Sequence, residues 1–312
     1  MTNGWLSSRM GVFVGLLAAL TLLGCRSDGG TSSGKPVVVS TVGMIDDVVR
    51  ELAGDRVEHR ALMGPGVDPH LYKATAGDVE RLSRSDLVLY VGLELEGRMT
   101  DVLGKMATGK RRVVAVGEAV PKDRLRRPPE FEGRYDPHLW FDPTLWAFVV
   151  DAIRDALIEL DPEGAESYTQ QAERYKAELA DLDAQAQRDV ATIPEDQRVL
   201  VTAHDAFGYF GQRYGFEVKG IQGTSTAAEA SARDIRDLAG LVARRRIRSI
   251  FVESSVPTAT IDALRQAVRA QGWDVQVGGS LFSDAMGDAG TPEGTYKGMF
   301  RHNVRTMVEG LR

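Results

Sequence analysis

The sequence predicts an α/β protein of two lobes, each with a mainly parallel four-stranded sheet flanked by helices, joined by one long backbone helix. In both halves of the chain, short β-branched runs alternate with amphipathic helical patterns, which is typical of parallel α/β layers. The runs in the first half are mainly apolar, except for residues 57–63, which include Glu58, His59 and Arg60. Mainly apolar runs are expected for strands that helices cover on both faces. Between the halves, residues 161–193 form a single helical pattern.

Residues 1–24 have the pattern of a signal peptide. Arg9 precedes an apolar run over residues 11–23, about 13 residues, which is too short to span a bilayer. The run ends in Leu22-Leu23-Gly24-Cys25, which resembles a bacterial lipobox, so we expect cleavage before Cys25 and lipidation of Cys25. Residues 25–35 then form a flexible, lipid-anchored linker. The alternative is an uncleaved anchor helix, and either way the chain is exported and tethered to a membrane.

The composition excludes some classes of protein. Cys25 is the only cysteine, so the fold has no intrachain disulfide and relies on burial. The net charge is −6, and the sequence shows no basic stripe interleaved with aromatic residues, so we expect no nucleic-acid partner.

The first lobe is expected over residues 36–160. Strands are predicted at residues 37–42, 57–63, 86–91 and 112–116. Helices are predicted at residues 44–53, at 75–83 and from Pro143 to about residue 160. A loop with three prolines, residues 121–133, leads to Asp136 and His138.

The linking helix is expected over residues 161–193. Asp161 is a predicted N-cap with Pro162 in the first helical position. One apolar stripe follows at steps of four and three, formed by Tyr168, Ala172, Tyr175, Leu179, Leu182 and Ala186. About 30 residues at 1.5 Å each give a rod of roughly 45 Å. A coiled-coil partner is the alternative to a spine between two lobes, but the stripe is short for a coiled coil.

The second lobe is expected over residues 194–312. Strands are predicted at residues 198–202, leading to His204, at 216–221, at 247–252, leading to Glu253, and at 274–277, leading to Gly278-Gly279. Helices are predicted at residues 226–244, 261–271 and about 294–311.

Three of the five histidines are candidates for metal binding. Asp-Pro-His-Leu occurs twice, at residues 68–71 and 136–139, and His204 opens an aromatic-rich run. Proline restricts its own φ and biases the residue before it away from helix, so each motif presents its imidazole from a rigid turn. Imidazole is the commonest protein ligand for transition metals. We therefore expect His70, His138 and His204 to converge on one ion.

A carboxylate completes the expected site. Asp284 follows the last predicted strand, and the three histidines also follow strand ends, the edge at which parallel sheets bind ligands. Three imidazoles and a carboxylate suit Zn²⁺, or Mn²⁺ and Fe²⁺ when the carboxylate is bidentate. Glu253 either orients a ligand from the second shell or pins the lobe interface. The alternative for the histidines is a turn position satisfied by backbone hydrogen bonds.

The remaining polar and aromatic candidates are interpreted as structural. His59 lies within a predicted strand and His302 on the last helix, where a structural or surface role is expected. Packing around the cleft, rather than stacking on a ligand, is expected for Trp140, Phe141, Phe207, Tyr209 and Phe210.

These motifs resemble those of the solute-binding lipoproteins of metal-ion ABC transporters, the zinc/manganese cluster, and specifically the TroA type. The resemblance covers the chain from about residue 37 to its end and is carried by residues 62–72, 136–141, 201–210, 251–255 and 281–287. It implies two α/β lobes joined by a long helix, with a metal ion held between them by His70, His138, His204 and Asp284.

The resemblance also bears on the cargo. Manganese-preferring members have a glutamate where this chain has His204, so the third imidazole points toward zinc or a mixed zinc/manganese site. Many dedicated zinc-uptake members have a histidine-rich loop before the second ligand, whereas residues 119–135 contain no histidine. The ligand set alone leaves the physiological cargo open, because such a site binds Zn²⁺ more tightly than Mn²⁺ whichever is carried.

The expected function is capture of Zn²⁺ or Mn²⁺ and its delivery to a membrane ABC permease by a monomeric, extracytoplasmic, membrane-anchored lipoprotein that is not an enzyme. Because the spine resists wide bending, we expect release through small lobe shifts or the withdrawal of one ligand. Affinity should fall with pH, since imidazoles coordinate when neutral. The rival is a zinc-dependent hydrolase with Glu253 or Asp205 as its base, which a fourth protein ligand disfavours.

Overall fold

A computed structural model describes residues 1, 34–108 and 112–312. The predicted signal peptide, Cys25 and nearly all of the predicted linker lie outside these residues. Residues 35–312 form one compact unit. Within the described residues, every helix is too short or too polar to cross a membrane.

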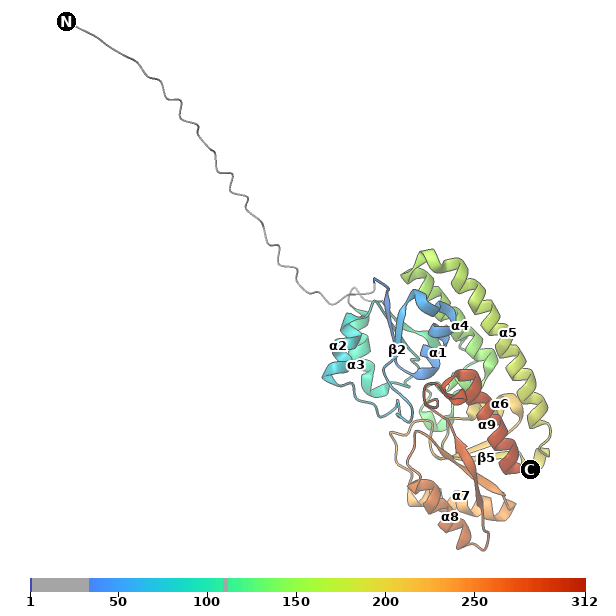
Figure 1. Ribbon diagram of the computed structural model, residues 1–312. Coiled ribbons are helices and arrows are strands. Elements are labelled where there is room, and N and C mark those ends of the chain that lie inside the picture. Colours follow the sequence, from blue (N-terminus) through green and yellow to red (C-terminus); the bar gives the residue numbers. More distant parts are fainter. Residues whose placement is uncertain (2–33, 109–111) are drawn as a thin grey trace. The chain divides into compact units, whose positions relative to one another are not determined.

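The first half folds around a parallel four-stranded sheet in the order β2-β1-β3-β4. The strands are Val37–Ser40 (β1), Glu58–Ala61 (β2), Leu87–Tyr90 (β3) and Arg112–Ala115 (β4). The helices of this half are Gly43–Ala53 (α1), Ala76–Arg84 (α2), Thr100–Ala107 (α3) and Pro143–Leu160 (α4). In Figure 1, α2 and α3 lie on one side of the sheet and α1 and α4 on the other. The predicted strands are confirmed, whereas α3 was not predicted.

The long helix is α5, Ala165–Val190, and all six residues of its predicted apolar stripe are buried. Its start differs from the prediction. Pro162–Gly164 form a 3₁₀ turn, and the Asp161 side chain caps no helix. That carboxylate instead accepts hydrogen bonds from the Arg56 guanidinium (2.8 and 3.0 Å) and from the Tyr168 hydroxyl (2.6 Å). Asp161 therefore ties α5 to the turn after α1.

The second half contains two parallel pairs of strands rather than the predicted single four-stranded sheet. Val199–His204 (β5) pairs with Glu217–Gln222 (β6), and Ser249–Glu253 (β7) pairs with Gln276–Leu281 (β8). β5 and β7 lie side by side, and a side chain joins their ends, because Glu253 Oε1 accepts the His204 backbone N–H at 2.9 Å. The predicted parallel α/β arrangement of the second half is confirmed, but its four strands form two separate pairs and not one sheet.

Three helices cover these strands: Gly208–Tyr214 (α6), Ala232–Arg245 (α7) and Ala259–Arg269 (α8). The helix predicted from residue 226 begins only at Ala232, because Ser231 and Asp234 form a capping box there. The strand predicted to stop at Gly278-Gly279 continues to Leu281. A Cβ on Gly278 would lie 2.7 Å from the Phe251 ring, so the glycine leaves space for that ring inside the strand pair.

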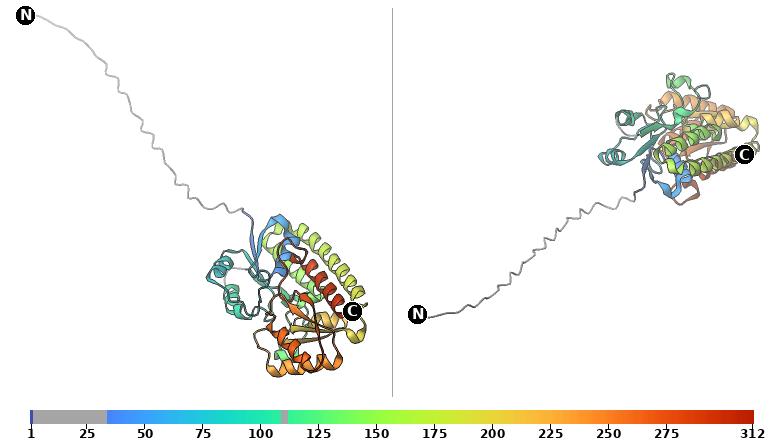
Figure 2. Two further views of the ribbon diagram at one scale, coloured as in Figure 1. Left: turned by 60° about the horizontal axis from the view of Figure 1, so that its bottom comes forward. Right: turned by 90° about the horizontal axis from the view of Figure 1, so that it is seen from above.

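The C-terminal helix α9, Tyr296–Leu311, packs along α5, and one apolar core runs from the first sheet into the second half of the chain. Figure 2 shows α9 (red) beside α5 (yellow-green). Four fully buried rings in this core come from both halves, and we call them the aromatic wall: Trp140, Trp146, Tyr296 and Phe300. Trp146 stacks on Tyr296 with ring centroids 5.5 Å apart and an interplanar angle of 16°.

Candidate metal centre

The structure brings His70, His138, His204 and Asp284 together. One ligand atom from each lies within 4.8 Å of all the others, and all four side chains are buried. His204 ends β5, Asp284 follows β8, and His70 follows β2, while His138 comes at the end of the long loop after β4. Carboxyl ends of parallel strands from both halves thus meet at one point, as the sequence predicted.

The distances suit a small cation with four or five donors. Asp284 Oδ1 lies 3.2 Å from His138 Nε2, and Asp284 Oδ2 lies 3.2 Å from His204 Nε2 and 3.8 Å from His70 Nε2. His70 Nε2 and His138 Nε2 are 3.3 Å apart. Ligands about 2.0–2.1 Å from a tetrahedral zinc ion lie roughly 3.3–3.4 Å from one another. Both oxygens of Asp284 face the imidazoles, so the carboxylate can bind through one oxygen or through both.

The repeated Asp-Pro-His motif is explained by its hydrogen bonds. Asp68 Oδ1 accepts the backbone N–H of His70 at 2.9 Å, and Asp136 Oδ1 accepts that of His138 at 3.0 Å. Each aspartate therefore closes a turn onto the residue two positions later, with proline stiffening the backbone between them. The Asp-Pro-His motif therefore fixes the direction in which its imidazole points.

Carboxylates also lie beside two of the three outer ring nitrogens. His138 Nδ1 is 2.8 Å from Asp136 Oδ1, and His204 Nδ1 is 2.6 Å from Glu253 Oε2. A carboxylate only accepts hydrogen bonds, so a proton held at Nδ1 leaves Nε2 of each ring as the electron-pair donor. His70 differs, because its buried Nδ1 has neither a hydrogen-bond partner nor a carboxylate within ion-pair distance among the described residues, and its one ion pair is made by Nε2.

The titration of the cluster follows from the same contacts. Burial lowers the pKa of His70 to about 3, against the opposing charge of Asp284. Burial also opposes the charged form of His138, but the Asp136 and Asp284 carboxylates outweigh it and raise its pKa to about 9. The carboxylates of Glu253 and Asp284 likewise overcome burial and raise the pKa of His204. Despite complete burial, His204 and His138 hold the pKa of Asp284 well below its usual range.

Buried atoms without partners fit a cation at the centre of the cluster. Within the described residues, both Asp284 oxygens and His204 Nε2 make no hydrogen bond, although they are buried. Buried polar groups are rarely left in that state. A divalent cation among them would satisfy all three atoms at once, and imidazole with carboxylate is a donor set that Zn²⁺ and Mn²⁺ accept.

Aromatic packing encloses the site. The Trp140 indole N–H donates to the Ser283 carbonyl at 2.8 Å and so fixes the residue before Asp284. Phe141 and Phe207 pack with ring centroids 4.3 Å apart. Tyr209 and Phe210 are also buried, so all five aromatic residues belong to the apolar core, although the ring contacts of Phe210 are with Tyr214, Phe216 and Phe300.

The other two histidines lie outside the cluster. His59 Nδ1 is 3.1 Å from Asp46 Oδ1, and His302 Nε2 is 3.0 Å from the Ser280 carbonyl. Asp205, a candidate base for the hydrolase alternative, is largely buried, and this burial raises its pKa to about 6.

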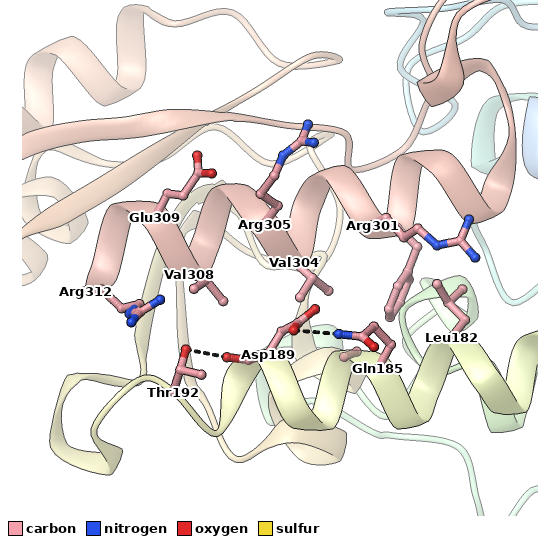
Figure 3. Close-up of a pocket in the computed structure, with 12 residues that line it drawn as sticks. Leu182, Gln185, Asp189, Thr192, Arg301, Val304, Arg305, Val308, Glu309 and Arg312 are labelled. Atoms are coloured by element: carbon pink, nitrogen blue, oxygen red, sulfur yellow. Dashed lines mark hydrogen bonds between the residues drawn. The ribbon is translucent and has the colours of Figure 1, made fainter.

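Two cavities show where the site can be reached. One of about 150 Å³ extends to Asp284 between the halves and is lined by Gly43, Asp46, Met63 and Met286, among others. The other, of about 420 Å³, lies between α5 and α9 and includes none of the four clustered residues. Figure 3 shows that Leu182 and Val304 reach into this second cavity. Of these two cavities, only the one between the halves borders the cluster, at Asp284.

Two polar contacts of the site were not predicted. The Thr226 hydroxyl donates to Asp68 Oδ2 at 2.6 Å, and Arg126 pairs with Asp136 Oδ2. Arg126 is ten positions from its partner, and Thr226 is 158 positions from Asp68. Neither residue stands in a motif that could have identified it. The Asp-x-His spacing, by contrast, did contain the signal for the two turn-closing aspartates.

Comparison with known proteins gives consistent matches over nearly the whole folded chain. The family model described as "Zinc-uptake complex component A periplasmic" matches residues 38–310. The chain is 53% identical over 280 residues to the zinc-binding protein TroA of Treponema pallidum, covering 90% of each chain. It is 46% identical over 303 residues to the manganese-binding lipoprotein MntA of Bacillus subtilis, covering 95% of this chain and 97% of that one.

Solved structures agree. The fold matches that of the zinc-binding TroA from Treponema pallidum with a TM-score of 0.87, covering 89% of this chain and 99% of that one. It matches Fe(III)-bound YtgA from Chlamydia trachomatis with a TM-score of 0.79 at 32% identity, covering 89% of this chain and 98% of that one. The names of these relatives mention zinc, manganese and iron.

Proposed function

The chain belongs to the family of periplasmic zinc-uptake complex components, the metal-binding proteins of ABC transporters, and we propose that it binds one Zn²⁺ or Mn²⁺ ion through His70, His138, His204 and Asp284. The observation that carries this assignment is the convergence of four buried ligand atoms within 4.8 Å of one another, with a donor set suited to these metals.

The choice between the two metals depends on Asp284. With one carboxylate oxygen, the site offers four donors in the arrangement that Zn²⁺ prefers. With both oxygens it offers five, and the additional oxygen favours the harder Mn²⁺. The 3.2 Å distances from the two oxygens to different imidazoles support both modes. Relatives named for zinc and for manganese resemble this chain at 53% and 46% identity.

Membership of this family supports the cellular role that we propose. The ion is cargo, which the protein delivers to a membrane ABC permease. Cys25 is the proposed lipid anchor, and the protein acts as an extracytoplasmic monomer with residues 25–35 as its linker. Several relatives are named as lipoproteins, among them MntA of Bacillus subtilis. The division into lobes at residues 36–160 and 194–312, with residues 161–193 as the link, belongs to the same proposal.

The hydrolase alternative has no support from this family, whose members are transport-associated metal-binding proteins and not enzymes. Hydrolytic zinc sites keep a coordination position for water. Here Asp284 is 1% exposed and offers a fourth protein ligand, in the coordination position that water would take in a hydrolase. Glu253 lies beside His204 Nδ1 and is best explained as the group that orients this ring.

The test is the replacement His138→Ala, measured by titration calorimetry with Zn²⁺ and with Mn²⁺ on the purified residues 35–312. The unchanged protein should bind one ion per chain, and the variant should bind it more weakly by orders of magnitude while remaining folded. His302→Ala is the matched control, because that histidine lies outside the cluster and should leave affinity unchanged. Full affinity in His138→Ala would contradict the proposed ligand set.

A further inference from the structure

The three imidazoles of the cluster are supported unequally. Carboxylates lie beside the outer nitrogens of His138 and His204, at 2.8 and 2.6 Å. No carboxylate lies beside the outer nitrogen of His70 within the described residues, and the residue is 2% exposed. Without a carboxylate at Nδ1, the ring is held by packing alone, so the position of His70 depends on the backbone that carries it.

That backbone is held by Asp68, whose two oxygens act on different parts of the molecule. Oδ1 accepts the His70 N–H at 2.9 Å, within the same turn. Oδ2 accepts the Thr226 hydroxyl at 2.6 Å, from the segment between β6 and α7. Thr226 is buried. We call the hydrogen bond between Thr226 and Asp68 the latch.

The latch is anchored near a second member of the cluster. Gln222 ends β6 and is the strand partner of His204 in β5. The Gln222 side-chain amide donates to the carbonyls of Thr226, at 3.4 Å, and of Ala228, at 3.1 Å. The hydroxyl of Thr226 thus connects the turn of His70 to the strand pair that presents His204.

We propose that Thr226 is a positioning residue that sets the lifetime of the bound ion, because its hydroxyl holds Asp68 and, through Asp68, the turn of His70. Given the proposed ligand set, His70 is then the first ligand to withdraw when the latch opens, while His138, His204 and Asp284 keep their positions. Opening requires only that one hydrogen bond break at the loop, with no movement of the helices that join the halves. A partner that draws away residues 223–231 would thereby trigger delivery.

The experiment compares Thr226→Val with Thr224→Val and Thr226→Ser. Valine at 226 keeps the size of the side chain and removes the donor. Thr224 is a matched control, because it lies in the same segment and is buried, but its hydroxyl has no hydrogen-bond partner among the described residues. Serine at 226 restores the hydroxyl. Dissociation of Zn²⁺ is followed by stopped flow into excess chelator, and Co²⁺ absorption reports the ligand set at equilibrium.

Thr226→Val should release Zn²⁺ about 10-fold faster. This is the lower end of the roughly 10- to 100-fold loss of affinity that follows removal of a group bonded directly to a metal ligand, because Thr226 acts through Asp68. Thr224→Val should release it at the unchanged rate, and Thr226→Ser should restore most of the lifetime. The Co²⁺ spectrum should keep its form in all three variants, since each retains all four donors. An unchanged rate in Thr226→Val, or equal acceleration in both valine variants, would overturn the proposal.

Coupling to His70 separates a positioning role from a general loss of stability. In a His70→Ala background the latch has no ligand to hold, so adding Thr226→Val should leave the Zn²⁺ dissociation rate unchanged. An effect of the same size in both backgrounds would contradict the mechanism. If valine prevents folding, Thr226→Ala removes the hydroxyl without constraint on packing and serves in its place. Failure of the unchanged protein to bind Zn²⁺ would instead contradict the proposed function itself.

Discussion

The two halves of the protein are joined in one region by buried aromatic rings and in another by single polar contacts between loops. The aromatic wall is apolar and fully buried, and two of its polar groups are paired: the Tyr296 hydroxyl donates to the Trp140 carbonyl at 2.8 Å, and the Trp140 indole N–H donates to the Ser283 carbonyl at 2.8 Å. At the loops, the latch joins the Thr226 hydroxyl to Asp68.

The two regions differ in what separation would cost. Each large ring withdrawn from the wall would lose roughly 1.5–3 kcal/mol of burial. Opening the latch exchanges one hydrogen bond to a carboxylate for hydrogen bonds to water, a net change of about 1.5–3 kcal/mol in total. Several rings form the wall and one hydroxyl forms the latch, so loop opening is the easier motion. The site is therefore expected to release its ion by loss of one ligand and not by wide separation of the lobes.

The largest effect on stability is expected when a ring of the aromatic wall is removed and a cavity is left in its place. Trp146→Ala should lower the free energy of unfolding by about 3–5 kcal/mol, the usual cost of removing a buried aromatic ring. The indole N–H of Trp146 has no hydrogen-bond partner among the described residues, so the loss is one of packing. Urea unfolding of the metal-free protein, followed by circular dichroism, measures it.

Trp273→Ala is the control for that measurement. Trp273 is only partly buried and packs against the smaller apolar cluster of the second half. Its loss should therefore cost clearly less. Equal destabilisation by the two changes would mean that the wall is no stronger than the rest of the core, and the contrast with the latch would fail.

A smaller, pH-dependent effect is expected at Asp183, which ties α5 to α6 near the wall. Its carboxylate accepts hydrogen bonds from Arg213 Nε at 2.9 Å and from the Tyr214 hydroxyl at 2.8 Å. Burial opposes its charge, but the contacts with Arg213 and Tyr214 prevail and lower the pKa of Asp183. A lowered pKa means that the stabilisation is present above the ordinary value of 3.8 and is lost as pH falls through the lower, folded value.

Asp183→Asn should therefore lower the free energy of unfolding by about 1.5–3 kcal/mol at pH 7, and the difference from the unchanged protein should shrink as pH falls toward 3. Urea unfolding at several pH values gives the profile. Asp181→Asn, an exposed neighbour on the same helix, is the control and should have little effect. A pH-independent difference would show that the charge of Asp183 does not stabilise α5 against α6.

Local patterns predicted much of the fold and brought the four clustered residues to attention. The runs of β-branched residues in the first half became strands, because residues 37–40 and 87–90 are buried between helices on both faces. The apolar stripe on α5 was also predictable, because apolar residues at helical spacing mark the face of a helix that is buried. The Asp-Pro-His repeat was visible because each turn is closed within three residues.

Features that depend on distant partners could not be predicted. Asp161 has the sequence signature of an N-cap, but Arg56, which lies 105 positions earlier, engages its carboxylate. The short helix α6 contains Gly208 and Gly211, which disfavour helix. Gly208 is required because a Cβ there would overlap the Arg126 guanidinium, and Gly211 because a Cβ would lie 2.6 Å from Val218. Such choices are decided by packing across the chain.

The smallest effect is expected at Arg126, where a further contact crosses between the halves. Arg126 lies in the loop before His138, pairs with Asp136, and stacks over the Tyr209 ring of α6 at 5.7 Å. The Arg126 side chain is 26% exposed and that of Asp136 is fully buried, so solvent screens only one end of the ion pair. Asp136 keeps its contacts with His138 when Arg126 is removed, so we expect the pair to contribute about 1 kcal/mol.

Arg126→Leu should therefore weaken Zn²⁺ binding by only about two- to fivefold, because Asp136 keeps its own contacts with His138 and leucine retains packing on Tyr209. Competition with a chelator of known affinity resolves a change of this size. Arg127→Leu is the matched control, since Arg127 stacks on Tyr135 and touches neither Asp136 nor α6 in the contacts described. A loss of a hundredfold or more in Arg126→Leu would give this ion pair a larger effect than the latch, and it would contradict the contrast between a rigid aromatic wall and a single polar contact that controls release.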